Sequence, residues 1–203
     1  NGVTVLPGEN VTEISGNGKV TGIITDKRSI ECDMVILVKG MQPNVDLATD
    51  TGLKLGNLGA IKVNNQMRTS KPNIYACGDC VETKSIITGK PTLSLKWRSA
   101  REQATVVAHN CIGQPTNYPG SVDVAGITIF DTHAVSMGLN SNAISNNTVE
   151  IIERKYPSRY YRLLTSNKVV VGAQFINHTR YAGAVLNAMR RGSDGETVKN
   201  IVE

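Results

Sequence analysis

Short strand-like runs fill both ends of the chain, and only two stretches have the spacing of an amphipathic helix. Turn residues separate the N-terminal strand patterns, which lie at residues 3–6, 11–14, 19–25 and 29–32. A hairpin is expected at residues 16–18. The five consecutive apolar residues 34–38 favour a strand buried on both faces, and the break after Gly40 marks a first boundary. The pattern predicts a mixed fold of sheets with a few helices.

From residue 44 to about 119 the sequence changes to loops, one strand expected at residues 73–76 and one helix. Ser94 is available as the N-cap of this helix, and Gly113 with Pro115 ends it. Side chains at three- and four-residue spacing form the face expected to be buried: Trp97, Ala100, Ala104, Val107 or Ala108, and Cys111.

The last part, from about residue 120, has the pattern of a small antiparallel sheet with helices. Strands are expected at residues 127–130, 149–155, 160–165 and 168–176, with a tight turn at Ser166-Asn167. A closing helix is predicted over residues 181–191, with Tyr181, Ala184 or Val185, Ala188 and Met189 on one face. This segment is expected to be an α+β unit.

Composition excludes several classes of protein. Hydrophobic residues make up 40% and charged residues 19% of 203 residues, as in ordinary globular domains. The net charge of +5 is mild and its lysines and arginines are scattered, so no nucleic-acid partner is expected. No apolar run approaches membrane-spanning length, and the start has no secretion-signal pattern. The four cysteines fit a reducing, cytoplasmic compartment, and the missing initiator Met suggests a chain that begins inside a longer protein.

Residues 67–80 carry the strongest indication of chemistry. Pro72 opens an extended segment, Gly78 lets the backbone approach a ligand, and Asp79 then presents a carboxylate at the strand's C-terminal end. Ligands of α/β folds bind at that end. An ionised Asp accepts hydrogen bonds from sugar or polyol hydroxyls. A Gly-Asp pair alone is also a common turn, so the pair needs support from its neighbours.

That support comes from a resemblance that covers essentially the whole chain. The ordered residues before the turn resemble the second flavin-binding motif of the pyridine nucleotide–disulfide oxidoreductase family, in its branch of NADH oxidases, coenzyme A disulfide reductases and rubredoxin reductases. The matching positions are Thr69, Ser70, Pro72, Ile74, Tyr75, Ala76, Gly78 and Asp79. Upstream, Gly40, Pro43, Asn44 and the glycine-rich residues 52–63 also resemble this family, and downstream Gln103, Ala104, Asn110 and Gly113 are similar to its flavin-facing helix.

The resemblance implies a fold and a set of cofactor contacts. Residues 1–43 would be the tail of an NAD(P)H-binding domain, residues 44–119 the C-terminal segment of an FAD-binding domain with Rossmann-like parts, and residues 120–203 an α+β dimerisation domain. Asp79 would bond the ribityl chain of FAD, with Gly78 giving close approach. Backbone groups at Lys96 and Trp97 would meet the pyrimidine edge of the flavin ring. Without the resemblance, Trp97 would be interpreted as a core anchor and Lys96 as a solvated side chain.

The departures from the family pattern limit what this chain is expected to do alone. It has no G-x-G-x-x-G fingerprint, and the family's fingerprints and redox-active cysteine lie upstream of such a segment. We therefore expect no catalytic residue here, and expect the chain alone to be inactive and to bind neither FAD nor NAD(P)H. The full-length protein would pass a hydride from NAD(P)H to FAD and on to oxygen, a disulfide or a redox protein.

An alternative is a non-catalytic dimerisation or interaction module, and a homodimer is expected in either case. The expected interface is the last strand, at Val169, Val170, Val171, Phe175 and Ile176, together with the face of the closing helix.

Cys77 and Cys80 form a C-x-x-C pair that invites a redox or zinc interpretation. A redox pair normally lies at a helix N-terminus, and zinc needs two further ligands at compatible spacing. The sequence shows neither, so we expect four buried, inert thiols and no metal site.

Overall fold

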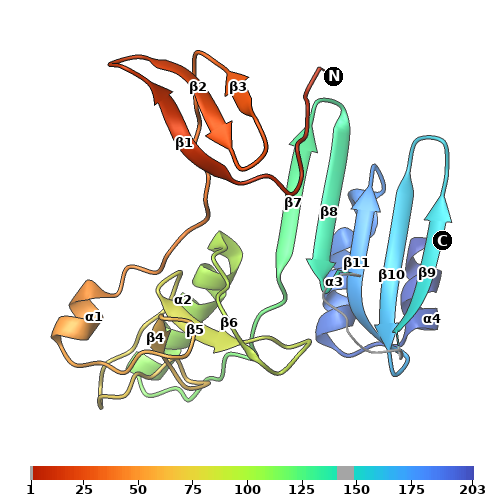
Figure 1. Ribbon diagram of the computed structural model, residues 1–203. Coiled ribbons are helices and arrows are strands. Elements are labelled where there is room, and N and C mark those ends of the chain that lie inside the picture. The colour runs from red at the N-terminus through yellow and green to blue at the C-terminus, as the bar shows by residue number, and fades with distance from the viewer. Residues whose placement is uncertain (1, 141–148) are drawn as a thin grey trace. The chain divides into compact units, whose positions relative to one another are not determined.

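The computed structural model describes residues 2–140 and 149–203 (Figure 1). Contacts divide the chain into two compact units, Asn1–Gln42 and Pro43–Glu203. Among the described residues, no helix combines the length and the hydropathy needed to cross a membrane.

The first unit is a three-stranded antiparallel sheet of β1 (Val11–Gly16), β2 (Val20–Thr25) and β3 (Ser29–Glu31), in that order. The predicted hairpin at residues 16–18 is confirmed. Gly16 has φ +147°, and a Cβ there would lie 2.0 Å from the carbonyl oxygen of Lys19, so only glycine fits at this position.

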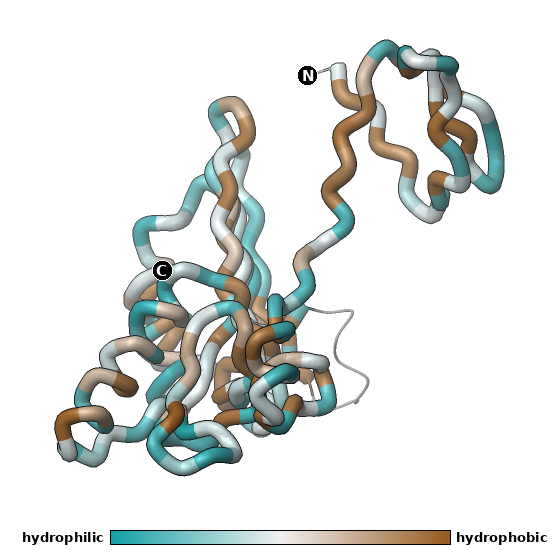
Figure 2. Tube along the Cα trace, turned by 90° about the vertical axis from the view of Figure 1, so that its left-hand side faces the viewer, coloured by the Kyte–Doolittle hydropathy of each residue, from teal (hydrophilic) through white to brown (hydrophobic). Residues whose placement is uncertain are grey.

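The strands predicted at residues 3–6 and 34–38 are not formed. Figure 2 shows both ends of this unit in hydrophobic colours, yet Ile36 and Val38 are 79% and 86% exposed. A strand buried on both faces needs hydrogen-bonded neighbours and a covering layer on each side. Within the described residues no strand pairs with either run, so the apolar pattern alone does not produce a strand here.

The second unit begins with α1 (Asp46–Asp50) and a small sheet of β4 (Ile61–Lys62), β5 (Val81–Lys84) and β6 (Pro91–Thr92), followed by α2 (Trp97–Cys111). Strands β4 and β5 are parallel. The strand predicted at residues 73–76 is reduced to one bridge between Tyr75 and Arg68, because Asn73 has φ +64° and turns the chain. The core of this part comprises Ala48, Ile61, Met67, Val81, Val106 and Tyr118.

Helix α2 forms where the sequence predicts a helix, but it buries a different face. Its buried residues are Ser99, Gln103 and Val106, whereas Ala104, Ala108 and Cys111 are exposed and Trp97 is 77% exposed. Ser94 is not the N-cap: the cap residue is Lys96, and the Ser94 hydroxyl lies 2.7 Å from that of Ser99. The apolar spacing failed as a guide because polar side chains on the buried face hydrogen-bond to neighbouring loops.

The C-terminal part is a five-stranded antiparallel sheet in the order β7-β8-β11-β10-β9. Its strands are β7 (Val124–Ile129), β8 (Thr132–Gly138), β9 (Val149–Lys155), β10 (Tyr160–Ser166) and β11 (Val169–Ile176). The turn between β10 and β11 is Asn167-Lys168, one residue later than expected, because both residues have positive φ (50° and 68°). Strand β8 was not predicted.

A short 3-10 turn (Thr179–Tyr181) leads to α3 (Ala182–Arg190), and α4 (Gly195–Val202), which was not predicted, ends the chain. Figure 1 shows α3 and α4 on the same face of the sheet. Side chains from both helices and from that face form the main core, which includes Tyr161, Val170, Phe175, Val185, Met189 and Val198.

Part of the surface expected for dimerisation is buried in this core. Val170 and Phe175 are at most 1% exposed, and the face of α3 around Val185 and Met189 is equally buried inside the chain. These side chains cover one another and leave no free surface. Of the expected interface, Val169 and Ile176 are 36% and 41% exposed, and Ile127, Ile129 and Ile151 are further exposed apolar side chains of the sheet.

Candidate functional site

The Gly78–Asp79 turn presents an open carboxylate. Gly78 has φ +92°, and its carbonyl oxygen accepts a hydrogen bond from the backbone N–H of Val81 at 3.3 Å, which closes the turn. Asp79 is exposed, and none of the hydrogen bonds or ion pairs among the described residues involves its carboxylate. A carboxylate in this state can accept hydrogen bonds from a ligand's hydroxyl groups.

The turn is attached to α2 by a buried amide. The backbone N–H of Gly78 donates to Gln103 Oε1 at 2.7 Å, and Gln103 is 1% exposed. The bond joins residues 25 positions apart. A Cβ built on Gly78 would lie 4.0 Å from Ala100 Cβ, so the turn lies directly against the early turns of α2.

The N-terminus of α2 is the second part of the candidate site. Lys96 is the N-cap with φ −138° and ψ 132°, and no side chain within the described part of the chain caps this helix. Lys96 and Trp97 are exposed, and the Arg101 guanidinium lies 5.6 Å from the centre of the Trp97 ring. The first N–H groups of a helix favour negative charge. The alternative interpretation of Trp97 as a core anchor is wrong.

The structure therefore brings together the residues expected at the site. Gly78 and Asp79 lie on a turn fixed to α2, while Lys96 and Trp97 begin that same helix. The resemblance named Gln103 as part of a flavin-facing helix, but the sequence assigned it no contact. Its contact with Gly78 depends on tertiary folding, and a residue's long-range partner leaves no local signal.

Cys77, beside the turn, is a poor nucleophile. Burial raises the pKa of the Cys77 thiol, and the neighbouring Cys80 raises it further. The Cys80 thiol lies 3.5 Å from the Cys77 carbonyl oxygen. A protonated thiol is unreactive compared with a thiolate. The expectation of four buried thiols is wrong, because Cys111 is exposed and the other three are partly buried.

A second feature missed by sequence reasoning connects α2 to α3. The Arg190 guanidinium donates to both oxygens of Glu102, at 2.7 and 3.0 Å, and Arg98 donates to Glu102 at 3.1 Å. Burial raises the pKa of the Glu102 carboxyl, but the hydrogen bonds from Arg190 and Arg98 outweigh it and hold the pKa below its usual value.

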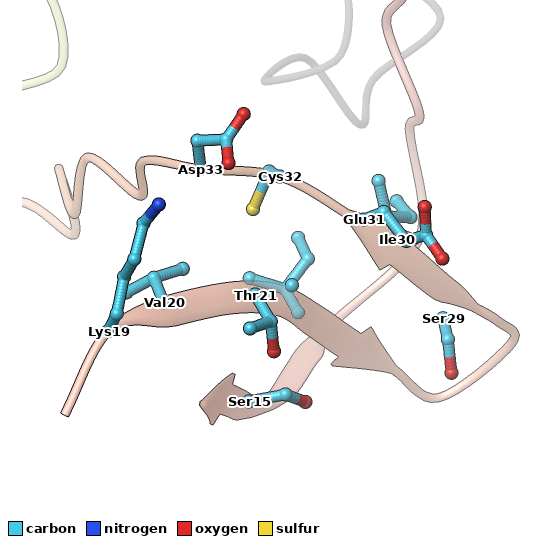
Figure 3. A pocket seen from close by; sticks show the side chains of 11 residues that line it. Ser15, Lys19, Val20, Thr21, Ser29, Ile30, Glu31, Cys32 and Asp33 are labelled. Carbon is cyan, nitrogen blue, oxygen red and sulfur yellow. The ribbon is translucent and has the colours of Figure 1, made fainter. Parts of the chain in front are cut away.

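A hollow of about 600 Å³ lies over the three-stranded sheet of the first unit (Figure 3). Its lining mixes hydroxyl groups with the charged side chains of Lys19, Glu31 and Asp33. None of the four expected site residues lines it. This hollow is therefore separate from the site expected from the sequence.

Comparison with known proteins places this geometry in a family. Residues 1–111 match the family model for pyridine nucleotide-disulphide oxidoreductases. An NADH oxidase from Methanocaldococcus jannaschii is 32% identical over 194 residues, which cover 89% of this chain and 43% of that protein. A CoA-dependent NAD(P)H sulfur oxidoreductase from Pyrococcus furiosus is 35% identical over 134 residues, which cover 66% of this chain and 30% of that protein.

A solved structure also matches this chain. An NAD-dependent persulfide reductase from A. fulgidus matches with a TM-score of 0.87 and 28% identity, over 98% of this chain and 40% of that one. The expected mixture of α/β and α+β structure is thereby confirmed. The chain spans less than half the length of these three relatives. Because the family model matches more than half of the sequence, the chain belongs to the pyridine nucleotide-disulphide oxidoreductase family.

Proposed function

We propose that this chain is the C-terminal portion of an FAD-dependent NAD(P)H oxidoreductase, and that Gly78, Asp79, Lys96 and Trp97 contact the flavin. The observation that carries the proposal is the junction of the Gly78–Asp79 turn with the start of α2. Within the part of the chain that the structure describes, it combines a carboxylate that has no protein partner with a helix N-terminus that no side chain caps. These two features fit a ligand that has both hydroxyl groups and an electron-rich ring edge.

Each residue has a definite task in this proposal. The Asp79 carboxylate accepts hydrogen bonds from ribityl hydroxyls, and Gly78 keeps the backbone free of a side chain where the ligand approaches. Backbone groups at Lys96 and Trp97 contact the pyrimidine edge, where the N–H groups of the first turn of α2 stabilise negative charge; the Lys96 N–H itself donates to the Ser94 carbonyl oxygen at 2.8 Å. Bound FAD would supply the hydride and electron transfer. We propose oxygen, a disulfide or a small redox protein as the final acceptor; the relatives include an NADH oxidase and a CoA-dependent NAD(P)H sulfur oxidoreductase.

The proposed segments follow the family pattern. Residues 1–43 would belong to the NAD(P)H-binding domain, residues 44–119 to the FAD-binding domain and residues 120–203 to a dimerisation domain. The alternative, a non-catalytic interaction module, is favoured only by the size of the C-terminal sheet and its uncovered apolar face. It gives no reason for an open carboxylate beside a helix N-terminus.

The proposal is tested with Asp79→Ala in the flavoprotein that contains this chain. Loss of a hydrogen bond to a charged group should raise the dissociation constant for FAD roughly 10- to 150-fold. Asp50→Ala, which removes another exposed carboxylate, is the matched control and should leave it unchanged. Equal FAD affinity in the Asp79 variant and the wild type, measured by titration of the apoprotein, would refute the assignment.

A further inference from the structure

We propose that Gln103 is a positioning residue for the cofactor-binding turn: it holds Gly78, and through Gly78 the Asp79 carboxylate, at a fixed place on α2. This inference rests on the proposed function, since it concerns how the flavin-contacting turn is oriented.

The contact has the features of a specific support. Gly78 N is a donor, so the amide atom that faces it at 2.7 Å is the oxygen of Gln103. The side chain is 1% exposed, and a buried N–H that loses its acceptor is costly. The backbone of Gly78 lies in the left-handed region, where alternative conformations are also open to glycine. A bond at this N–H therefore restricts the one residue of the turn with the greatest freedom.

The helix that carries Gln103 is itself fixed on both sides. At Glu102, the preceding residue, two hydrogen bonds from Arg190 join α2 to α3. Two turns later, the Asn110 amide donates to the carbonyl oxygens of Gln66 and Thr116 at 3.1 and 2.8 Å. Because α2 is anchored, the Gln103 oxygen occupies a defined position relative to the N-terminus of α2. The same helix thus sets both proposed flavin contacts, at the turn and at residues 96–97.

A purely structural role for Gln103 makes a different prediction. Loss of packing would lower the stability of the whole fold, whereas loss of positioning would change the turn and the flavin without a comparable effect elsewhere. Val106→Ala provides the comparison, because Val106 is buried on the same face of α2, one turn further on, and takes no part in the bond to Gly78.

The first measurement uses the 203-residue chain and needs no flavin. Gln103→Met keeps the length of the side chain but removes the acceptor, and Gln103→Glu keeps an acceptor oxygen. Amide hydrogen exchange at Gly78 should accelerate about tenfold in Gln103→Met, a loss of the size expected for one hydrogen bond, and return toward wild type in Gln103→Glu. Unchanged exchange at Gly78 in Gln103→Met would overturn the inference.

The second measurement uses the flavoprotein that contains this chain. Gln103→Met should weaken FAD binding about tenfold and alter the visible circular dichroism of the bound flavin, while Gln103→Glu restores both. Val106→Ala should lower the melting temperature but leave both flavin readouts unchanged. If FAD binds as in wild type in Gln103→Met, or is weakened equally in Val106→Ala, the inference fails and the proposed function stands. If the wild-type protein binds no FAD, both fail together.

Discussion

Two neighbouring side chains illustrate how strongly position decides chemistry. Asp79 is exposed and its carboxylate has no protein partner among the described residues, whereas Cys77, two positions earlier, is half-buried and has a raised pKa. Both follow from the sharp turn at Gly78, which directs one side chain outward and the other toward α2 and the core around Met67. The sequence shows that a cysteine and an aspartate occupy these positions, but it does not show how exposed each side chain is.

The raised pKa of Cys77 predicts an order of thiol reactivity. At pH 8 a smaller fraction of Cys77 is thiolate than for a thiol with the ordinary pKa, and Cys77 is also partly buried. Iodoacetamide should therefore modify exposed Cys111 first and Cys77 several times more slowly. The difference should narrow as the pH rises above 9.0, the ordinary value for the thiol. Peptide mass spectrometry over a time course measures both rates. Faster labelling of Cys77 than of Cys111 would contradict the prediction.

Asn110 gives a stability prediction at the same scale. Its amide donates to the Val106, Gln66 and Thr116 carbonyl oxygens, and its Oδ1 accepts from the Thr116 N–H at 3.0 Å. Asn110→Ala removes all of these bonds and should lower the free energy of unfolding by roughly 1–3 kcal/mol. Urea denaturation of the chain measures the change. The control is Thr105→Ala, because Thr105 is exposed and its hydroxyl hydrogen-bonds only within α2. This variant should lower the free energy of unfolding by less than Asn110→Ala does.

At the scale of elements, helix α2 shows what spacing can and cannot predict. Its length and its end at Gly113 follow from helix signals, but the face predicted to be buried was wrong. Helical spacing of apolar residues assigns those residues to the core. Here Gln103, Ser99 and Asn110 face inward instead, because loops supply their hydrogen-bonding partners. Trp97 lies outside, at the proposed cofactor site.

The link between α2 and α3 predicts a pH effect on stability. The folded pKa of Glu102 is below its unfolded value, so the pair with Arg190 stabilises the fold fully above about pH 4.5 and progressively less as the pH falls through the folded pKa. Glu102→Gln should therefore cost about 1 kcal/mol at pH 7 and less near pH 3. Denaturant curves at both values test this. Glu196→Gln, at an exposed pair within α4, should show almost no cost at either pH; an equal cost in both variants would contradict the prediction.

At the scale of the whole molecule, the ordered motif around Gly78 was enough to predict the family and the mixed fold class, because the order and spacing of these residues can be read directly from the sequence. Residues 34–38 show the limit of the same reasoning. Their apolar pattern describes what a strand would bury, but no strand among the described residues pairs with it. The missed strand β8 and helix α4 show the same limit, since their burial comes from contacts made only in the assembled sheet.

We propose that the C-terminal sheet forms a homodimer through the face opposite α3 and α4. The strand register places Ile127, Ala134, Ile176 and Tyr160 in one row across β7, β8, β11 and β10. The adjacent row, with Phe175 and Tyr161, faces the helices and is at most 1% exposed, so the first row must face away. Ile127 and Ile176 on this outer face are 58% and 41% exposed. A symmetric partner is the usual cover for such an apolar face.

Light scattering of the chain should therefore report about twice the chain mass of 21.8 kDa. Ile176→Glu places a charge at the centre of the proposed interface and should produce a monomer, because an unpaired charge buried between two sheets costs several kcal/mol. Ile112→Glu is the matched control: Ile112 is 69% exposed but is the C-cap of α2 and not part of the sheet, so this variant should remain dimeric. A wild-type monomer at tens of micromolar, or a dimer that survives Ile176→Glu, would contradict this interface.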